Sequence, residues 1–205
     1  MAEFCRDSGE YLRERPFYRI VRGILLTLGR ALYRPQIVGT ELVPAEGGVV
    51  LAGNHTSKKD WILHIMALKR QVHFLGKREL HDGKLGALVD RMGVIPVNRA
   101  VHDRWALDTA ILGLREGKVI AVFPESTINL SDDVTLPFKI GAVKMAAETG
   151  APLIPFTITG RFRIFRKGPT LTFWPPVYPD PGDLDEANRQ FMELIRTKLT
   201  EARPD

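Results

Sequence analysis

Residues 47–77 read "GGVVLAGNHTSKKDWILHIMALKRQVHFLGK", and they carry the clearest structural pattern in the chain. A short apolar run bounded by glycine, residues 47–54, predicts a buried strand. The apolar segment 61–69 predicts a short helix, and residues 71–77 predict a second strand. A strand, a helix and a strand in this order form the unit from which parallel sheets are built.

The same alternation continues along the chain, which has no internal repeat. Its 205 residues are enough for one domain with a sizeable core. We therefore predict an α/β fold, a single domain with a mostly parallel central sheet flanked by helices. Further strands are expected at 93–99, 118–125, 152–160 and 169–177, and further helices at 85–92, 103–115, 142–149 and from 183 onward.

The composition is that of an ordinary globular protein, with 44% hydrophobic and 26% charged residues. The single cysteine, Cys5, excludes an intramolecular disulfide and a thiolate-rich zinc site, and it fits a reducing compartment. The formal net charge is +5. A basic balance spread over the whole chain would have suggested nucleic acid as the partner.

The positive charge is instead concentrated in residues 11–34, which contain six arginines and a single acidic residue, Glu14. Apolar residues recur in this segment at spacings of three and four, as in an amphipathic helix. Its longest uncharged stretch, Gly23 to Gly29, is far shorter than the ~20 residues of a membrane span, and no signal-peptide cleavage pattern follows. We expect residues 1–35 to associate with an anionic membrane surface and residues 36–205 to form the main domain. A surface helix packed on its own domain is the alternative.

His55 and Asp60 lie just after the first predicted strand, and their spacing limits how they can meet. Five positions in a regular helix would leave the two side chains ~140° apart. They can interact only if His55 lies in the turn before the helix and Asp60 lies inside the helix. In that geometry the carboxylate fixes one imidazole nitrogen and leaves the other free to act as a general base.

Two other interpretations of this stretch remain open from the residues alone. Asp60 and His64 share one helical face and, with His55, could ligate a metal, although no second ligand cluster follows. Asn54 or Ser57 could instead be a helix cap and His55 incidental. The spacing by itself is a weak motif.

Four blocks together make the chain resemble the glycerolipid acyltransferases of the lysophosphatidic acid (1-acylglycerol-3-phosphate) acyltransferase type. "NHTSKKD" is similar to the family's Asn-His-four-residue-Asp block. "FLGKREL" with "GVIPVNR" is similar to the second block. "FPEST" with "LPFKIGA" is similar to the third, and "APLIPFTITG" to the fourth. The blocks cover about residues 40–160 in the family's order.

The resemblance implies transfer of an acyl group from a thioester, on coenzyme A or acyl carrier protein, to a hydroxyl of a glycerol phosphate. His55 would take the proton of that hydroxyl, and Asp60 would hold and polarise His55. No metal or cofactor is implied beyond the acyl donor itself. The substrate-binding positions that correspond to the family's blocks are Lys77, Arg78, Glu125, Ser126 and Thr127. Backbone amides near residues 53–57 are candidate oxyanion donors.

The third block departs from the family's usual Glu-Gly-Thr-Arg, because this chain reads Glu-Ser-Thr-Ile at residues 125–128. Ile128 cannot bind a phosphate, and a serine disfavours a positive φ where the family has glycine. Either another base substitutes, with Arg78, Arg99 and Arg161 as candidates, or the acceptor is glycerol-3-phosphate, another lysolipid or a glycolipid.

The expected partners are an anionic membrane surface, the acyl donor and a glycerol phosphate or lysophospholipid acceptor, without nucleic acid. The expected location is the cytoplasmic face of a bacterial-type cell membrane, as a peripheral protein. A lipid-binding or transfer protein that has lost the chemistry is the alternative of another class, as is a metal-dependent hydrolase that uses the His55, Asp60 and His64 set.

Overall fold

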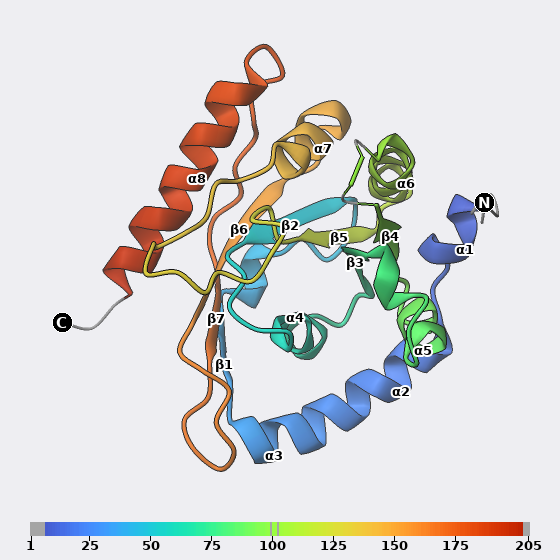
Figure 1. Ribbon diagram of the computed structural model, residues 1–205, viewed down its shortest axis with the longest axis vertical. Helices are drawn as coiled ribbons and strands as arrows, with labels where there is room; N and C mark the ends of the chain where they lie inside the picture. The colour runs from blue at the N-terminus through green and yellow to red at the C-terminus, as the bar shows by residue number, and fades with distance from the viewer. Residues whose placement is uncertain (1–6, 99, 102, 203–205) are drawn as a thin grey trace.

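The computed structural model describes residues 7–98, 100–101 and 103–202, and a seven-stranded sheet runs through its centre. The sheet has the spatial order β1-β7-β6-β2-β5-β3-β4. Figure 1 shows helices on both sides of it. The strands are β1 (Gln36–Val38), β2 (Val49–Gly53), β3 (Val72–Lys77), β4 (Ile95–Val97), β5 (Val119–Val122), β6 (Leu153–Thr159) and β7 (Thr170–Phe173).

Five neighbouring strands, from β6 to β4, run in the same direction. The β6–β7 pair is antiparallel, and β1 runs parallel to β7. The prediction of a mostly parallel sheet is therefore confirmed, and one hairpin reverses the direction at one side. Because β2 and β5 are central, their carboxyl ends meet in the middle of one sheet edge.

The central strands are apolar throughout because both faces of the sheet are covered. On β2, Val50 and Ala52 point into the core on one side, and Val49 and Leu51 into the core on the other. The first face is covered by α6 (Arg104–Arg115), α7 (Gly141–Thr149) and α8 (Leu184–Glu201) (Figure 1). The second face is covered by α2 (Pro16–Ile24) and α4 (Asp60–Ala67), with α5 (Gly86–Arg91) beside them.

Helix ends follow the capping residues of the sequence. The side chain of Asp103 accepts a hydrogen bond from Ala106 N at 3.1 Å, and that of Asp183 accepts one from Glu186 N at 2.9 Å. Gly150 closes α7 with φ 68°. Asp and Gly are favoured at these positions because the first satisfies a free backbone N–H and the second tolerates a left-handed backbone.

The N-terminal segment differs from the single amphipathic helix of the prediction. A short helix α1 (Ser8–Leu12) comes first, and α2 then continues through a π-helical turn, Leu25–Gly29, into α3 (Arg30–Tyr33). Tyr18 is buried in the core, whereas Ile20, Ile24 and Leu28 are 52–61% exposed. One side of the segment therefore packs on the domain and another apolar side faces outward. Among the helices that the structure describes, none is long and apolar enough to cross a membrane.

Candidate active site

Polar residues of the first and third sequence blocks gather at the edge where β2, β5 and β6 end. In the sheet register Ala52 of β2 pairs with Val122 of β5, and Gly53 pairs with Phe156 of β6. His55 follows β2 by two residues and Glu125 follows β5 by three. Residues 70 positions apart in sequence are thus brought together by the strand order.

His55 and Asp60 meet in the geometry that the spacing allows. His55 lies in the turn after β2, and Asp60 is the first residue of α4. The imidazole Nδ1 lies 2.9 Å from Asp60 Oδ2. An ionised carboxylate has no proton to give, so Nδ1–H donates and Nε2 keeps its lone pair. The ring is 19% exposed while Asp60 is fully buried, which leaves the imidazole accessible to a substrate.

The Asp60 side chain also accepts hydrogen bonds from the turn that precedes α4. Its Oδ2 also accepts the backbone N–H groups of Thr56 at 2.7 Å and Ser57 at 2.9 Å. The hydroxyl of Thr56 donates to Oδ1 at 3.2 Å. These bonds satisfy both oxygens of a buried side chain. They also fix residues 55–57 relative to the first turn of α4.

Glu125 holds the same turn from the other side. Its Oε1 accepts the backbone N–H of His55 at 2.8 Å, and its Oε2 accepts that of Leu136, also at 2.8 Å. The side chain is buried, and this desolvation raises the pKa of Glu125, although both backbone donors lower it. The carboxylate therefore joins the turn after β2 to the long loop after β5.

The amides of the 53–57 turn were expected to be candidate oxyanion donors. The backbone N–H groups of His55, Thr56 and Ser57 are all bonded to the carboxylates of Glu125 and Asp60. Three of the candidate donors are thus already used by the protein in this structure.

Asn54 anchors the start of the turn. Its side-chain amide donates to Ile158 O at 2.9 Å, and its Oδ1 accepts Ile158 N at 2.7 Å. The side chain thus continues the pairing between β2 and β6 for one more position. Immediately before it, a Cβ on Gly53 would lie 2.0 Å from Phe156 O, so only glycine fits there.

Aromatic rings pack against the His55 imidazole. The Phe123 ring stacks on His55, with ring centroids 4.1 Å apart and planes 19° apart. His64 lies beneath Phe123 and contacts Phe74, Phe156 and Phe173 through ring edges. Complete burial lowers the pKa of His64 to about 4. It is therefore a neutral core residue near pH 7.

The metal alternative is not supported by this arrangement. His64 Nδ1 donates to the backbone carbonyl of Asp60 at 3.2 Å, and the side chain of Asp60 faces His55. Within residues 7–98, 100–101 and 103–202, no group of three or more His, Cys, Asp or Glu side chains could hold a metal ion.

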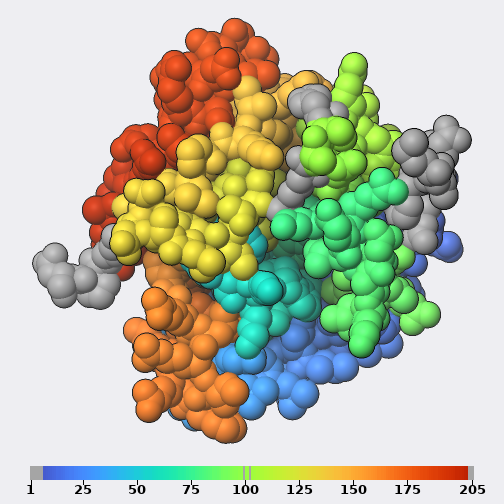
Figure 2. Space-filling model, in the orientation of Figure 1, coloured from blue at the N-terminus to red at the C-terminus, as the bar shows by residue number. Residues whose placement is uncertain are grey.

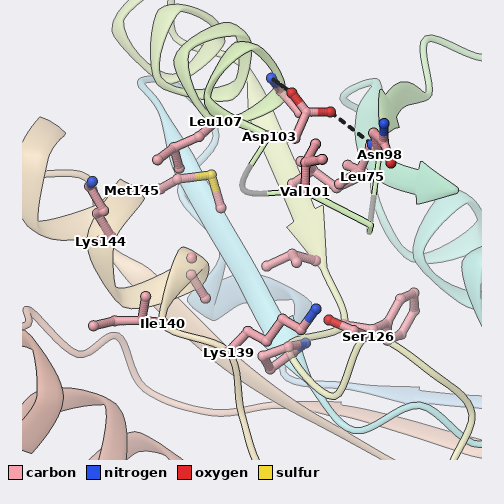
Figure 3. Close-up of a pocket in the computed structure, with 17 residues that line it drawn as sticks. Leu75, Asn98, Val101, Asp103, Leu107, Ser126, Lys139, Ile140, Lys144 and Met145 are labelled. Atoms are coloured by element: carbon pink, nitrogen blue, oxygen red, sulfur yellow. Dashed lines mark hydrogen bonds between the residues drawn. The ribbon is translucent and has the colours of Figure 1, made fainter. Parts of the chain in front are cut away.

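A mainly apolar pocket of about 380 Å³ opens beside Phe123, between α6 and α7 and over the ends of β3, β4 and β5. Figure 3 shows Lys139 next to Ser126 at one end and Asp103 at the other. The apolar side chains of the lining are Leu75, Val97, Val101, Ala106, Leu107, Val122, Phe123, Pro124, Ile140, Ala142 and Met145.

The predicted substrate-binding residues lie in different parts of this sheet edge. Glu125 is bonded to His55, and Ser126 lines the apolar pocket, while Thr127 is exposed beside them. Lys77 ends β3 and is exposed, and Arg78 lines a second pocket of about 220 Å³ with Asn98 and Trp105. β5 lies between β3 and β2, so the Lys77–Arg78 pair follows a strand two positions away from β2 at the same sheet edge.

Ser126 adopts the left-handed conformation that the sequence made unfavourable, with φ 60°. A serine therefore adopts here a positive φ that a glycine would tolerate without strain. Of the alternative bases, Arg161 is exposed in the loop after β6, and Arg99 lies outside the described residues, as do Cys5 and His102.

The family model described as acyltransferase matches residues 34–159, which is more than half of the chain. The chain belongs to the acyltransferase family. It is 33% identical over 138 residues to the 1-acyl-sn-glycerol-3-phosphate acyltransferase of Bacillus subtilis, covering 65% of this chain and 68% of that protein. It is 34% identical over 134 residues to the enzyme of the same name from Borreliella burgdorferi, covering 64% and 53%.

A solved structure has the same fold. It is the crystal structure of the 1-acyl-sn-glycerophosphate acyltransferase PlsC from Thermotoga maritima, which matches with a TM-score of 0.66 and 24% identity. The match covers 95% of this chain and 87% of that one. The likeness therefore extends beyond the region of the four blocks to most of the chain.

Proposed function

We propose that the protein transfers a fatty acyl group from an acyl thioester to the free hydroxyl of 1-acylglycerol-3-phosphate. The observation that carries this proposal is the His55–Asp60 pair, with Nδ1 bonded to a buried carboxylate and the ring partly exposed at a sheet edge. The names of the relatives in Bacillus subtilis and Borreliella burgdorferi support the reaction and the acceptor.

The acyl group passes directly from the thioester to the acceptor, without an acyl-enzyme. The lone pair on His55 Nε2 takes the proton of the acceptor hydroxyl while its oxygen attacks the thioester carbonyl. Asp60 stabilises the imidazolium that forms. The tetrahedral intermediate then expels the thiolate, which takes the proton from His55 and leaves as a free thiol. The acyl group is now an ester, and the histidine is neutral again.

The apolar pocket beside Phe123 is suited to the acyl chain. Burial of each methylene contributes ~0.8 kcal/mol, so a volume of about 380 Å³ lined mainly by aliphatic side chains favours a hydrocarbon occupant. Lys139 and Ser126 are polar groups at one end of this pocket (Figure 3).

The acceptor phosphate requires positive charge, which Ile128 does not supply. Lys77, the last residue of β3, is exposed at the same edge of the sheet as His55. We assign the phosphate to this region, with Lys77 as its main contact, because an ammonium group forms charge-assisted bonds to phosphate oxygens. The exposed apolar side of α2, flanked by arginines, supports peripheral attachment to an anionic membrane.

The test is a thiol-release assay with one long-chain acyl-CoA and three acceptors: 1-acylglycerol-3-phosphate, glycerol-3-phosphate and an uncharged lysolipid. We expect the first acceptor to give the highest kcat/KM. His55→Ala should lower the rate by ~10²–10⁴-fold while circular dichroism and vesicle binding are unchanged. A purified His55→Ala protein with near-normal turnover would refute the assignment of the base. A higher kcat/KM for another acceptor would refute 1-acylglycerol-3-phosphate as the substrate and would be consistent with Ile128 in place of the family's usual arginine.

A further inference from the structure

We infer that the loop between β6 and β7, residues 160–169, is a second lipid-contact element that docks on an anionic bilayer together with the N-terminal helix. The inference rests on the proposed function in one respect, which is that the proposed acceptor is a membrane lipid. The two elements together form what we call the docking surface, defined by the loop 160–169 and the outward side of residues 20–28.

The loop has the composition of a membrane-interface segment. Its sequence, "GRFRIFRKGP", contains four basic residues and no acidic one. The large apolar side chains of Ile164 and Phe165 are 59% and 66% exposed. All four basic residues, at 161, 163, 166 and 167, are exposed around them. Apolar side chains surrounded by cations are suited to the boundary between acyl chains and anionic headgroups.

Phe165 combines an uncommon backbone conformation with an exposed ring. Its φ is 58°, in the left-handed region that aromatic residues rarely adopt. Its exposed ring gains little packing within the protein to offset that conformation. The strained backbone is held by a hydrogen bond from Phe165 N to Leu32 O at 2.7 Å. This conformation is compatible with a role in which the exposed ring contacts lipid, because strained residues often lie at functional sites.

The loop is attached to the N-terminal helix, so the two elements present one surface. Besides the bond to Leu32, Gly168 N donates to Arg34 O at 3.4 Å. The rings of Tyr33 and Phe162 meet edge to face with centroids 5.4 Å apart. Figure 2 shows the loop beside the N-terminal helix on one side of the molecule. Ile20, Ile24 and Leu28 recur every four residues along that helix and stay exposed.

The docking surface is also next to the catalytic turn. The loop leaves the carboxyl end of β6, the edge at which β2 ends and the His55 turn begins. Lys59 Nζ donates to Tyr33 OH at 3.1 Å and lies 5.9 Å from the centroid of the Phe162 ring. Lys59 directly precedes Asp60. A bilayer on this surface would therefore present lipid headgroups to the edge that holds His55.

The experiment measures co-sedimentation of the full chain with vesicles of phosphatidylglycerol in phosphatidylcholine. We expect Ile164→Ser/Phe165→Ser to weaken binding by roughly tenfold or more, because two apolar side chains lose their burial. Tyr178→Ser is the matched control, since Tyr178 is exposed to a similar extent, 69%, outside the docking surface. It should bind as the unmodified protein does.

A second pair of variants tests the charges. Arg163→Gln/Arg166→Gln should weaken binding to these vesicles by about tenfold or more and leave the weaker binding to pure phosphatidylcholine unchanged. Arg115→Gln/Arg189→Gln removes the same number of positive charges from α6 and α8, and it should have little effect. An equal loss in the control pair would mean that only the net charge matters, and it would overturn the inference.

Acyl transfer is measured in parallel with the acceptor in detergent micelles, where no bilayer is required. If both loop variants bind vesicles as the unmodified protein does, the inference is wrong and the proposed function is unaffected. If no acceptor is acylated by any of the proteins but the loop variants still lose vesicle binding, the proposed function is wrong and the lipid-contact role of the loop remains supported.

Discussion

The backbone N–H of His55 donates to the carboxylate of Glu125, 70 residues later in the chain, at 2.8 Å. The second oxygen of that carboxylate accepts Leu136 N. Glu125 is thus a positioning residue for the histidine in this structure, whereas the family resemblance predicts a contact with substrate. The two roles lead to different kinetics.

Glu125→Gln should lower kcat by about ten- to a hundredfold and leave the KM of the acceptor nearly unchanged. The amide oxygen can accept only one of the two backbone bonds, and the NH₂ group faces the other donor, which costs roughly 1–3 kcal/mol. Steady-state kinetics over a range of acceptor concentrations measures both constants. A large rise in KM with an unchanged kcat would favour the substrate contact instead.

Asp60→Asn should reduce kcat by ~10²–10⁴-fold, because the amide cannot stabilise an imidazolium and presents a donor to Thr56 N or Ser57 N. Free energies of unfolding from urea titrations should also fall, since a buried network loses acceptors. Asp108→Asn, at an exposed position of α6, is the control and should leave both quantities unchanged. Full activity in Asp60→Asn would contradict the role given to this carboxylate.

Ser126→Gly should raise the free energy of unfolding by about 1 kcal/mol, because the left-handed backbone with φ 60° is strained for serine and not for glycine. Thermal or urea unfolding measures the gain. Gly150→Ser is the reverse control, because φ is 68° there and the change should destabilise by a similar amount. A destabilised Ser126→Gly protein would show that the serine side chain makes contacts worth more than the backbone strain.

Stability should fall as the pH decreases from about 6.5 towards 4. Burial lowers the pKa of His64 and of His73 from 6.5 to about 4 in the folded protein. In that window the unfolded chain binds protons that the folded one does not, so the slope approaches ~1.4 kcal/mol per pH unit for each histidine. Burial raises the pKa of Glu125, so above pH 4.5 the folded protein keeps a proton that the unfolded chain releases. The stability from this group is lost as the pH rises, which partly offsets the slope from the histidines.

Urea unfolding at several pH values between 7.5 and 4.5 measures the slope. His73→Asn is the informative variant, because its amide can replace the bond from Nδ1 to Gly93 O without a titrating group. The slope should then fall by about half. An unchanged pH dependence would mean that His73 does not contribute to it.

Leu107→Trp should shift the preferred donor towards shorter acyl chains. Leu107 lines the apolar pocket from α6, so a larger side chain reduces the buried length available to the chain. Each methylene that is no longer buried loses ~0.8 kcal/mol, about fourfold in kcat/KM. A series of acyl-CoA chain lengths measures the shift, and Leu112→Trp on the exposed side of the same helix is the control.

Most of the sheet and the contact between His55 and Asp60 could be predicted because local sequence determines them. The apolar run of β2 bounded by glycine predicted a strand that is buried on both faces. The five-residue spacing of His55 and Asp60 required a turn followed by a helix. Asp103 and Asp183 predicted the starts of two helices, since capping depends on residues within one turn.

The features that were not predicted depend on distant parts of the chain. β1, with only three residues, is a strand because it pairs with β7. The role of Glu125 depends on the order of β2 and β5 in the sheet, which no local pattern contains. The sequence does not show which apolar side of α2 packs on the domain and which faces outward. That distinction depends on the buried position of Tyr18 in the core.

The antiparallel β6–β7 pair has a consequence for how this scaffold can diversify. The parallel neighbours of the sheet need long crossover connections whose helices form the core, whereas an antiparallel pair needs only a hairpin. Insertions or deletions between residues 160 and 169 would leave the parallel strand register and the layer of α6, α7 and α8 intact. We expect natural variation in the length of this hairpin to adapt the enzyme to bilayers of different composition without retuning its chemistry.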